Sequence, residues 1–180
     1  MKKTLVLTMT ILCLITSAKA GDNMEVLTDK IIKKSRTVDC SIDTMWWKWT
    51  THDGLKTFFS EDNNVELKVG GPFEIYFSMD EAPSLRGSEG CKVISYLPKE
   101  MISFSWNAPP KYPEIRDGDY HTWVVVTFKP MKGNRTEVRI NHLGWLRGGD
   151  WDQVYDYFDN AWVRVLDWIE KSCKKNVPRR

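Results

Sequence analysis

Few side chains in this 180-residue chain could do acid–base or metal chemistry, and they are widely spaced. The three histidines are His52, His121 and His142, and their separations match no zinc-binding pattern. His142 stands in a strand-like run on the same face as Val138 and Ile140, so it could orient a ligand or exchange a proton. A histidine that pairs with a neighbouring group to hold a strand end explains this position better, because no nucleophile stands nearby in the sequence. We therefore assign no catalytic residue and keep His142 as the one candidate.

Three other charged residues could serve a ligand. Arg86 and Arg116 stand in the two long irregular segments and could reach over a cavity mouth to a ligand carboxylate, although loop arginines are commonly just exposed. Glu74 alternates with Phe73 and Ile75, which predicts a solvated charge on the outer face of a strand. The sequence has no glycine-rich phosphate loop, no Gly-x-Ser-x-Gly turn and no calcium-binding loop. We expect no metal, no cofactor and, in preference to an enzyme, a binding protein.

The first twenty residues have the pattern of a bacterial secretory signal peptide. Two lysines precede an apolar run over Leu5–Ile15, and an Ala-Lys-Ala sequence ends at Ala20. The apolar run is short for a membrane span, so we expect cleavage after Ala20 and no integral membrane segment afterwards. This predicts a periplasmic or secreted protein.

The charge balance argues against an anionic polymer as partner. The chain has 26 basic and 24 acidic residues, and its leader contributes three lysines and no acid. The mature chain is thus close to neutral, and we expect no nucleic-acid partner. All nine tryptophans follow the leader, and so many large rings must be buried or line a cavity.

Three cysteines follow the leader: Cys40, Cys91 and Cys173. Their spacing matches no metal site, and small buried thiols are the favoured interpretation of all three. In an oxidising compartment one pair could bridge and leave one cysteine free, but the sequence does not say which pair.

The apolar pattern predicts an α+β domain over residues 31–175, between a leader segment over 21–30 and a basic tail over 176–180. Turns at Gly70-Gly71-Pro72 and Lys132-Gly133-Asn134 separate strand-like runs. The expected elements are a strand over Ile31–Cys40, helices over Thr44–Thr50 and Gly54–Phe59, strands over Val65–Val69, Phe73–Met79, Cys91–Leu97, Met101–Trp106, Tyr120–Phe128 and Thr136–Trp145, and a helix over Asp150–Cys173.

Alternation along the strands predicts which side chains face inward. Val138, Ile140 and His142 share the inner face of one strand. The same rule places Ile102, Phe104, Trp106, Val124, Val126 and Phe128 inside. The last helix has an apolar stripe of Trp151, Val154, Tyr155, Phe158, Trp162, Val165 and Ile169. Rings of this size on a helix can hold it away from a sheet, which favours a cavity.

These segments resemble the START-like (SRPBCC) superfamily with the helix-grip fold, in the branch similar to the C-terminal domain of the Hsp90 ATPase activator. The resemblance covers about residues 30–173. It is carried by Val38–Trp49, Asp53-Gly54-Leu55, Gly70-Gly71-Pro72-Phe73-Glu74, Gly90, Tyr96-Leu97-Pro98, Ser103–Trp106, Thr136–Trp145 and the final aromatic helix. It implies a curved antiparallel sheet of about seven strands, two short helices and a long C-terminal helix over the concave face. The superfamily includes lipid binders, polyketide cyclases and co-chaperones, so the resemblance alone selects no activity.

The leading hypothesis is a domain that binds a small apolar or amphipathic molecule between its last helix and its sheet. The predicted lining consists of Phe104, Trp106, Val124, Val126, Phe128, Ile140, His142, Tyr155, Phe158 and Trp162. One alternative is a cyclase-like or dehydratase-like enzyme with His142 as its acid–base residue. Another is a protein-interaction module that uses exposed Trp47, Trp123 or Trp145 and has no ligand. Export argues against a co-chaperone of cytosolic Hsp90. The identity of the ligand, the openness of the cavity and the oligomeric state stay open.

Overall fold

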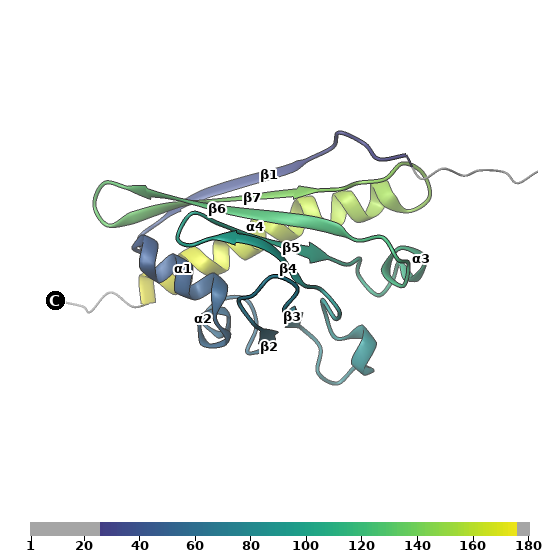
Figure 1. The fold of residues 1–180 in the computed structure, drawn as a ribbon, viewed down its shortest axis with the longest axis horizontal. Helices are drawn as coiled ribbons and strands as arrows, with labels where there is room; N and C mark the ends of the chain where they lie inside the picture. The colour runs from purple at the N-terminus through teal and green to yellow at the C-terminus, as the bar shows by residue number, and fades with distance from the viewer. Residues whose placement is uncertain (1–25, 176–180) are drawn as a thin grey trace, which may run out of the picture.

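A computed structural model describes residues 26–175, in which a long helix lies across a large antiparallel sheet and a small second sheet lies beside it (Figure 1). The α+β class is confirmed, and so is the expected order of one strand, two short helices, six strands and one long helix. The elements are β1 (Ile32–Val38), α1 (Ile42–Thr50), α2 (His52–Lys56), β2 (Asp62–Val65), β3 (Phe73–Tyr76), a 3-10 turn (Pro83–Leu85), β4 (Val93–Leu97), β5 (Met101–Trp106), α3 (Pro113–Arg116), β6 (Thr122–Met131), β7 (Arg135–Leu143) and α4 (Trp151–Lys175). No helix in this range is long and apolar enough to cross a bilayer.

The seven strands form two sheets rather than one. The large sheet has the order β1-β7-β6-β5-β4, and β2 pairs only with β3. Isolated bridges, Pro72 with Lys92 and Tyr76 with Gly87, connect β3 to the chain around β4. The expected strand over Val65–Val69 is wrong, because the paired residues end at Val65 and the following backbone turns back on itself. Val69 is 67% exposed, so its apolar side chain contributes nothing to the core.

The predicted facing of the strands is confirmed. Val138, Ile140 and His142 are fully buried, and Val124 and Val126 of β6 lie opposite His142 and Ile140 in the register. The helix stripe is also buried, except that Tyr155 is only half-buried. Both sets of buried residues could be predicted from the sequence, because side chains alternate between the faces of a strand and a helix repeats every 3.6 residues.

The α1–α2 corner is fixed by close packing and local hydrogen bonds. Ser41 accepts a hydrogen bond from the Thr44 backbone and caps α1. A Cβ on Gly54 would lie 2.1 Å from the Trp47 carbonyl oxygen, so only glycine allows this approach. Lys48 is fully buried and donates to the Thr57 hydroxyl at 2.6 Å, and its burial lowers the pKa of its amine. The corner therefore holds the chain just beyond α2 in place.

Ion pairs join helix α4 to the large sheet along the flank that faces β1. Basic side chains on and just before β1 pair with acids on that flank. The pairs are Lys30–Asp152 (2.6 Å), Lys34–Asp159 (2.8 Å), Arg36–Asp167 (2.8 Å) and Arg36–Glu170 (2.5 Å). Partly exposed pairs each contribute little to stability. Their common direction nevertheless fixes which flank of α4 faces β1 and which flank stays free.

A disulfide joins Cys40, just after β1, to Cys173 in the last turn of α4. The expectation of three free thiols is thus wrong for these two, because the fold brings together residues that are 133 positions apart. Cys91 is the free, buried thiol, and its burial raises its pKa to about 12. The covalent bond closes nearly the whole domain into one loop.

Removal of this disulfide should lower the free energy of unfolding by about 2–5 kcal/mol, since a long loop then regains its freedom in the unfolded chain. The measurement is guanidinium unfolding of the Cys40→Ser, Cys173→Ser double variant against the unmodified protein. Dithiothreitol serves as the matched control: it should weaken the unmodified protein and leave the double variant unchanged. Equal stability of the two proteins under oxidising conditions would contradict the disulfide.

Candidate ligand-binding site

The space between α4 and the large sheet is filled by side chains. Four of the inward-facing residues have no surface accessible to solvent: Phe104, Val124, Val126 and Ile140. The ring of Trp162 on α4 lies 5.5 Å from that of Trp106 on β5, and Phe104 stacks on Phe73 of β3 with their centroids 3.8 Å apart. The large rings of α4 favoured a cavity here and left its openness undecided; in the structure the rings pack against the sheet and fill this space.

A chain of hydrogen bonds runs through this packed interior. The Trp162 indole N–H of α4 donates to Nδ1 of His142 at 3.0 Å. Nε2 of His142 lies 2.7 Å from the Thr122 hydroxyl, which in turn donates to the Trp106 carbonyl at 2.8 Å. Because Nδ1 accepts, the proton of the neutral ring is on Nε2, and His142 donates to Thr122. The chain links α4, β7, β6 and β5, and Trp145 also donates to the His142 carbonyl at 2.9 Å.

His142 has no free nitrogen for acid–base chemistry in this arrangement. Its side chain is fully buried, and both ring nitrogens have protein partners. Burial lowers its pKa well below the ordinary value, so the ring is neutral. This matches the structural interpretation of His142, although its partners are a hydroxyl and an indole rather than a backbone group or a carboxylate.

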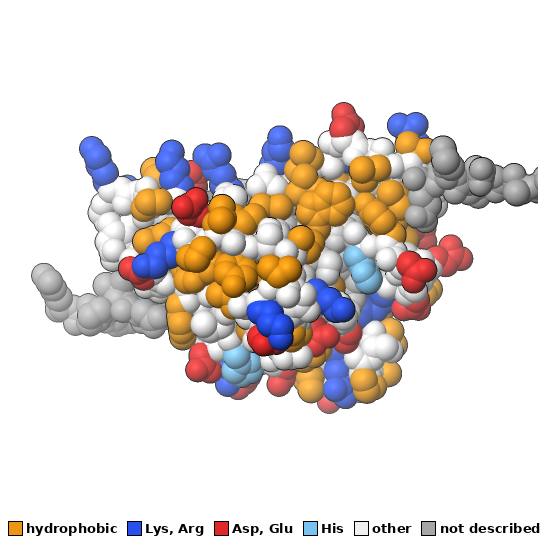
Figure 2. All heavy atoms as spheres, in the orientation of Figure 1, with side chains coloured by type: hydrophobic (Ala, Val, Ile, Leu, Met, Phe, Trp, Pro, Cys, Tyr) orange, Lys and Arg blue, Asp and Glu red, His pale blue; other side chains and the backbone are white. Residues whose placement is uncertain are grey.

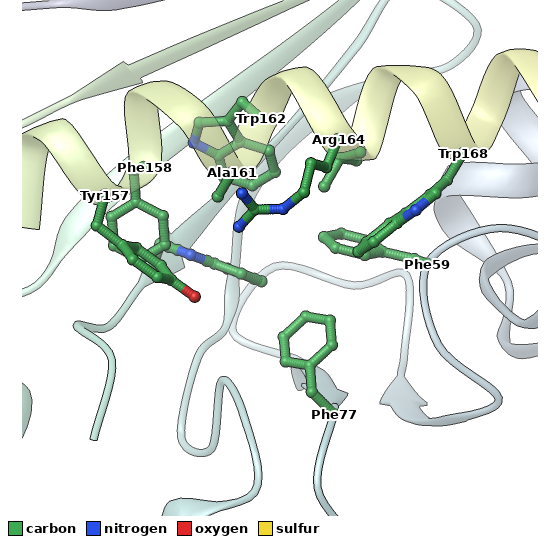
Figure 3. Close-up of a pocket in the computed structure, with 10 residues that line it drawn as sticks. Phe59, Phe77, Tyr157, Phe158, Ala161, Trp162, Arg164 and Trp168 are labelled. Carbon is green, nitrogen blue, oxygen red and sulfur yellow. The ribbon is translucent and has the colours of Figure 1, made fainter. Parts of the chain in front are cut away.

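A hollow opens on the free flank of α4, opposite β1 (Figure 3). It has a volume of about 110 Å³ and is lined chiefly by Phe59, Phe77, Trp106, Tyr157, Arg164 and Trp168. We call this hollow the α4 groove. Figure 3 shows Tyr157, Arg164 and Trp168 projecting from α4 and facing Phe59 and Phe77 across the hollow.

The α4 groove is built by residues repeated along one flank of α4 and by two residues that lie just beyond α2 and β3. Tyr157, Ala161, Arg164 and Trp168 recur at three- and four-residue intervals, so they share one flank of α4. Phe59 follows the α1–α2 corner, and its ring lies 5.8 Å from that of Phe77 beyond β3. The floor is aromatic as well.

The floor of the α4 groove is tied to the buried hydrogen-bond chain. The Phe59 ring stacks near Trp106 with centroids 6.1 Å apart, and Trp106 lies 5.5 Å from Trp162. Trp106 and Trp162 are the two ends of the chain through His142 and Thr122. The groove therefore has a rigid floor, while Phe77 and Trp168 on its rim are 52% and 38% exposed.

Two further hollows adjoin the α4 groove and lengthen it. One, of about 210 Å³, shares Phe77, Trp106 and Tyr157 with it and continues to Arg86 and the 107–110 segment. The other, of about 280 Å³, shares Phe59 and Trp168 and reaches Lys171 near the end of α4. Together they make an elongated apolar surface alongside the helix.

The structure brings together only part of the predicted lining. Trp106, Phe158 and Trp162 line the α4 groove, whereas Phe128 belongs to the packed core and Tyr155 packs against Trp145. The sequence reasoning missed the other groove residues. For Tyr157, Arg164 and Trp168 a signal existed, because they repeat along the helix beside the buried stripe. Phe59 and Phe77 carry no such signal, since they lie beyond element ends.

The two candidate loop arginines have different surroundings. Arg116 is buried, pairs with Glu89 and donates to the carbonyls of Ser84, Gly87 and Ala108. It therefore clamps two loops together, and the expectation that it meets a ligand is wrong. Arg86 is half-buried and lines the hollow next to the α4 groove.

Glu74 is tied into the protein instead of standing free in solvent as expected. It accepts hydrogen bonds from Tyr76, Asn64 and the Gly90 backbone. Burial acts to raise its pKa, but these hydrogen bonds outweigh burial and lower the pKa. No group of three or more potential metal ligands occurs within residues 26–175.

The outer face of the large sheet carries a second apolar surface. Figure 2 shows hydrophobic side chains gathered over the strands, with lysines and arginines along the edge near β1. Leu97 is 55% exposed there, and it pairs with Met101 on the face opposite to buried Ile102 and Phe104. Among the tryptophans suggested for an interaction surface, Trp47 is exposed and Trp123 is half-buried against Gly144, but Trp145 is buried, so that expectation is wrong for Trp145.

Comparison with known proteins agrees with the architecture. Residues 39–173 match the family described as activator of Hsp90 ATPase homolog 1-like protein. The chain belongs to this family. The resemblance found in its sequence is therefore confirmed, although no curated protein sequence matches it.

Solved structures of the Hsp90-activator-like fold superimpose on most of the chain. A protein from Mesorhizobium loti is 19% identical, with a TM-score of 0.63, and the match covers 82% of this chain and 99% of that one. The Aha1 dimer from Colwellia psychrerythraea is 17% identical, with a TM-score of 0.61 and coverage of 80% and 96%. An HSP90 activator from Plasmodium falciparum is 19% identical, with a TM-score of 0.55 and coverage of 74% and 88%. At these identities the similarity is one of fold.

The burial of neutral His142 should make this Hsp90-activator-like domain sensitive to mild acid. Its folded pKa is below its unfolded value of about 6.5, so below that pH the unfolded chain binds the extra proton. The free energy of unfolding should therefore fall by about 1.4 kcal/mol between pH 7.5 and pH 5.5. Urea unfolding across this range measures the loss.

Two variants isolate the effect of His142. His142→Gln should be less stable at pH 7.5 but should lack the decline toward pH 5.5. Thr122→Val, which removes a partner of the ring and keeps the histidine, should be destabilised at every pH and retain the decline. A decline that persists in His142→Gln would show that another group causes it.

Proposed function

We propose that this protein is an exported binding protein that holds a small apolar or amphipathic molecule in the α4 groove. The observation that carries the proposal is the set of solvent-exposed rings, Phe77, Tyr157 and Trp168, above an aromatic floor. Each 100 Å² of apolar surface removed from water stabilises a complex by about 2.5 kcal/mol. A guest covering these rings gains that energy without opening the core.

Two observations support export. The leader pattern ending at Ala20 is typical of a secretory signal, and the Cys40–Cys173 disulfide suits an oxidising compartment. Export also separates the protein from cytosolic Hsp90 and its ATP. We therefore do not propose activation of Hsp90, the activity for which some of its structural relatives are named.

The alternative of a cyclase-like enzyme has less support. It needs an acid–base residue at the ligand, and the one candidate, His142, lies below the groove floor with both nitrogens bonded. The interaction-module alternative rests on exposed apolar side chains of the outer face of the sheet, such as Leu97, which by themselves define no partner.

Binding of the fluorescent probe N-phenyl-1-naphthylamine tests the groove. The purified protein should bind it and raise its fluorescence, because rings shield the probe from water. Phe77→Ser and Trp168→Ala should each weaken binding about tenfold, which corresponds to about 1.4 kcal/mol. Both residues are on the rim, so circular dichroism should show an intact fold.

Leu97→Ser is the matched control for the probe titration. It removes a side chain as exposed as Phe77, but from the outer face of the sheet. It should leave the probe affinity unchanged. An equal loss in Leu97→Ser and Phe77→Ser, or no binding by the unmodified protein, would refute the groove as the binding site.

Export predicts a shortened chain. Expressed in a bacterium with its leader, the protein should accumulate outside the cytoplasm with Gly21 as its first residue, because cleavage follows Ala20. Osmotic-shock fractionation and intact mass measurement check both points. Full-length protein confined to the cytoplasm would contradict the export part of the proposal and leave the groove unaffected.

A further inference from the structure

Arg164 stands out among the charged residues of α4. It projects into the aromatic α4 groove, and Figure 3 shows its guanidinium group between Tyr157 and Trp168. It makes no ion pair or hydrogen bond with any residue of the described range 26–175. A free guanidinium among rings retains all its donors for an incoming group.

The acids near Arg164 are engaged elsewhere. Asp167, one turn further along α4, pairs with Arg36 of β1 at 2.8 Å. Glu170 also pairs with Arg36, and with Lys174, and the hydrogen bonds from Lys174 and Arg36 lower its pKa to about 2. The ion pairs between α4 and β1 thus engage these two acids on the side away from the groove and leave Arg164 without a counter-ion.

The rest of the extended groove has the same sign of charge. The adjoining hollows contain Arg86 at one end and Lys171 at the other. No aspartate or glutamate lines any of the three hollows within the described residues. A nearly neutral chain therefore presents an apolar groove with only positive charge in its walls.

We propose that the ligand of the α4 groove is a free, monomeric anionic amphiphile whose single carboxylate pairs with Arg164. This rests on the proposed binding function and adds the charge and shape of the guest. A carboxylate accepts two parallel hydrogen bonds from a guanidinium, and contact of the apolar tail with the rings of the groove adds to this pairing. The apolar tail lies along α4, where Tyr157 to Trp168 span about 16 Å of helix.

Three twelve-carbon probes test this pairing. Dodecanoate, dodecanol and dodecyltrimethylammonium share a tail and differ in charge. Each is titrated by calorimetry at pH 8, the two ionic probes below their micelle concentrations and dodecanol below its solubility limit. The unmodified protein should bind dodecanoate at least tenfold more tightly than dodecanol, and the cationic probe more weakly than both. Arg164→Met should lose most of the preference for dodecanoate and keep its affinity for dodecanol, because methionine retains the apolar stem.

Two further variants serve as controls. Arg164→Lys keeps the charge without the two-pronged geometry and should retain part of the preference. Lys33→Met removes one positive charge from an exposed position on β1, away from the groove, and should bind all three probes like the unmodified protein. Thermal unfolding checks that each variant is folded.

The outcomes separate this inference from the proposed function. Binding of none of the probes would refute both. Equal affinity for dodecanoate and dodecanol, or an equal loss of both in Arg164→Met, would overturn the anionic ligand and leave apolar binding intact. Binding to phosphatidylglycerol vesicles, with no binding of monomeric dodecanoate, would overturn it in favour of a membrane surface.

Discussion

The hydrogen-bond chain from Trp162 through His142 and Thr122 to Trp106 is the constraint on which the rest of the structure depends. Apolar packing alone is non-directional, so a helix covered with rings could settle on a sheet in several ways. A buried hydrogen bond that must be satisfied permits one of them. His142 thus sets the depth and rotation of α4. It can do so because a neutral imidazole accepts the hydrogen bond from Trp162 at Nδ1, whereas a protonated ring has no acceptor.

That depth has a consequence for ligand binding. Phe104, Trp106, Phe158 and Trp162 fill the volume that a helix-grip fold could leave open between helix and sheet. The apolar surface still available lies beside the helix. The ion pairs to β1 and the Cys40–Cys173 disulfide hold the other flank of α4, so the free flank can meet a ligand while the helix stays in place.

Membership of the Hsp90-activator-like family accounts for the architecture and leaves function to local chemistry. Three features of this chain bear on its function: a disulfide at the end of α4, a filled interior and an unpaired arginine among exposed rings. Each is compatible with a small exported binding domain. None of them requires a reacting group.

The sequence by itself determined the fold class, the inward faces of β6 and β7 and the buried stripe of α4, because these follow from local periodicity. It did not determine which cysteines join, since Cys40 and Cys173 are 133 positions apart. Only the tertiary structure decided that the strands divide into two sheets and that Phe59 and Phe77 face α4. The isolation of Arg164 also depended on it, because whether Asp167 pairs with Arg164 or with Arg36 is settled by the strand that packs beside the helix.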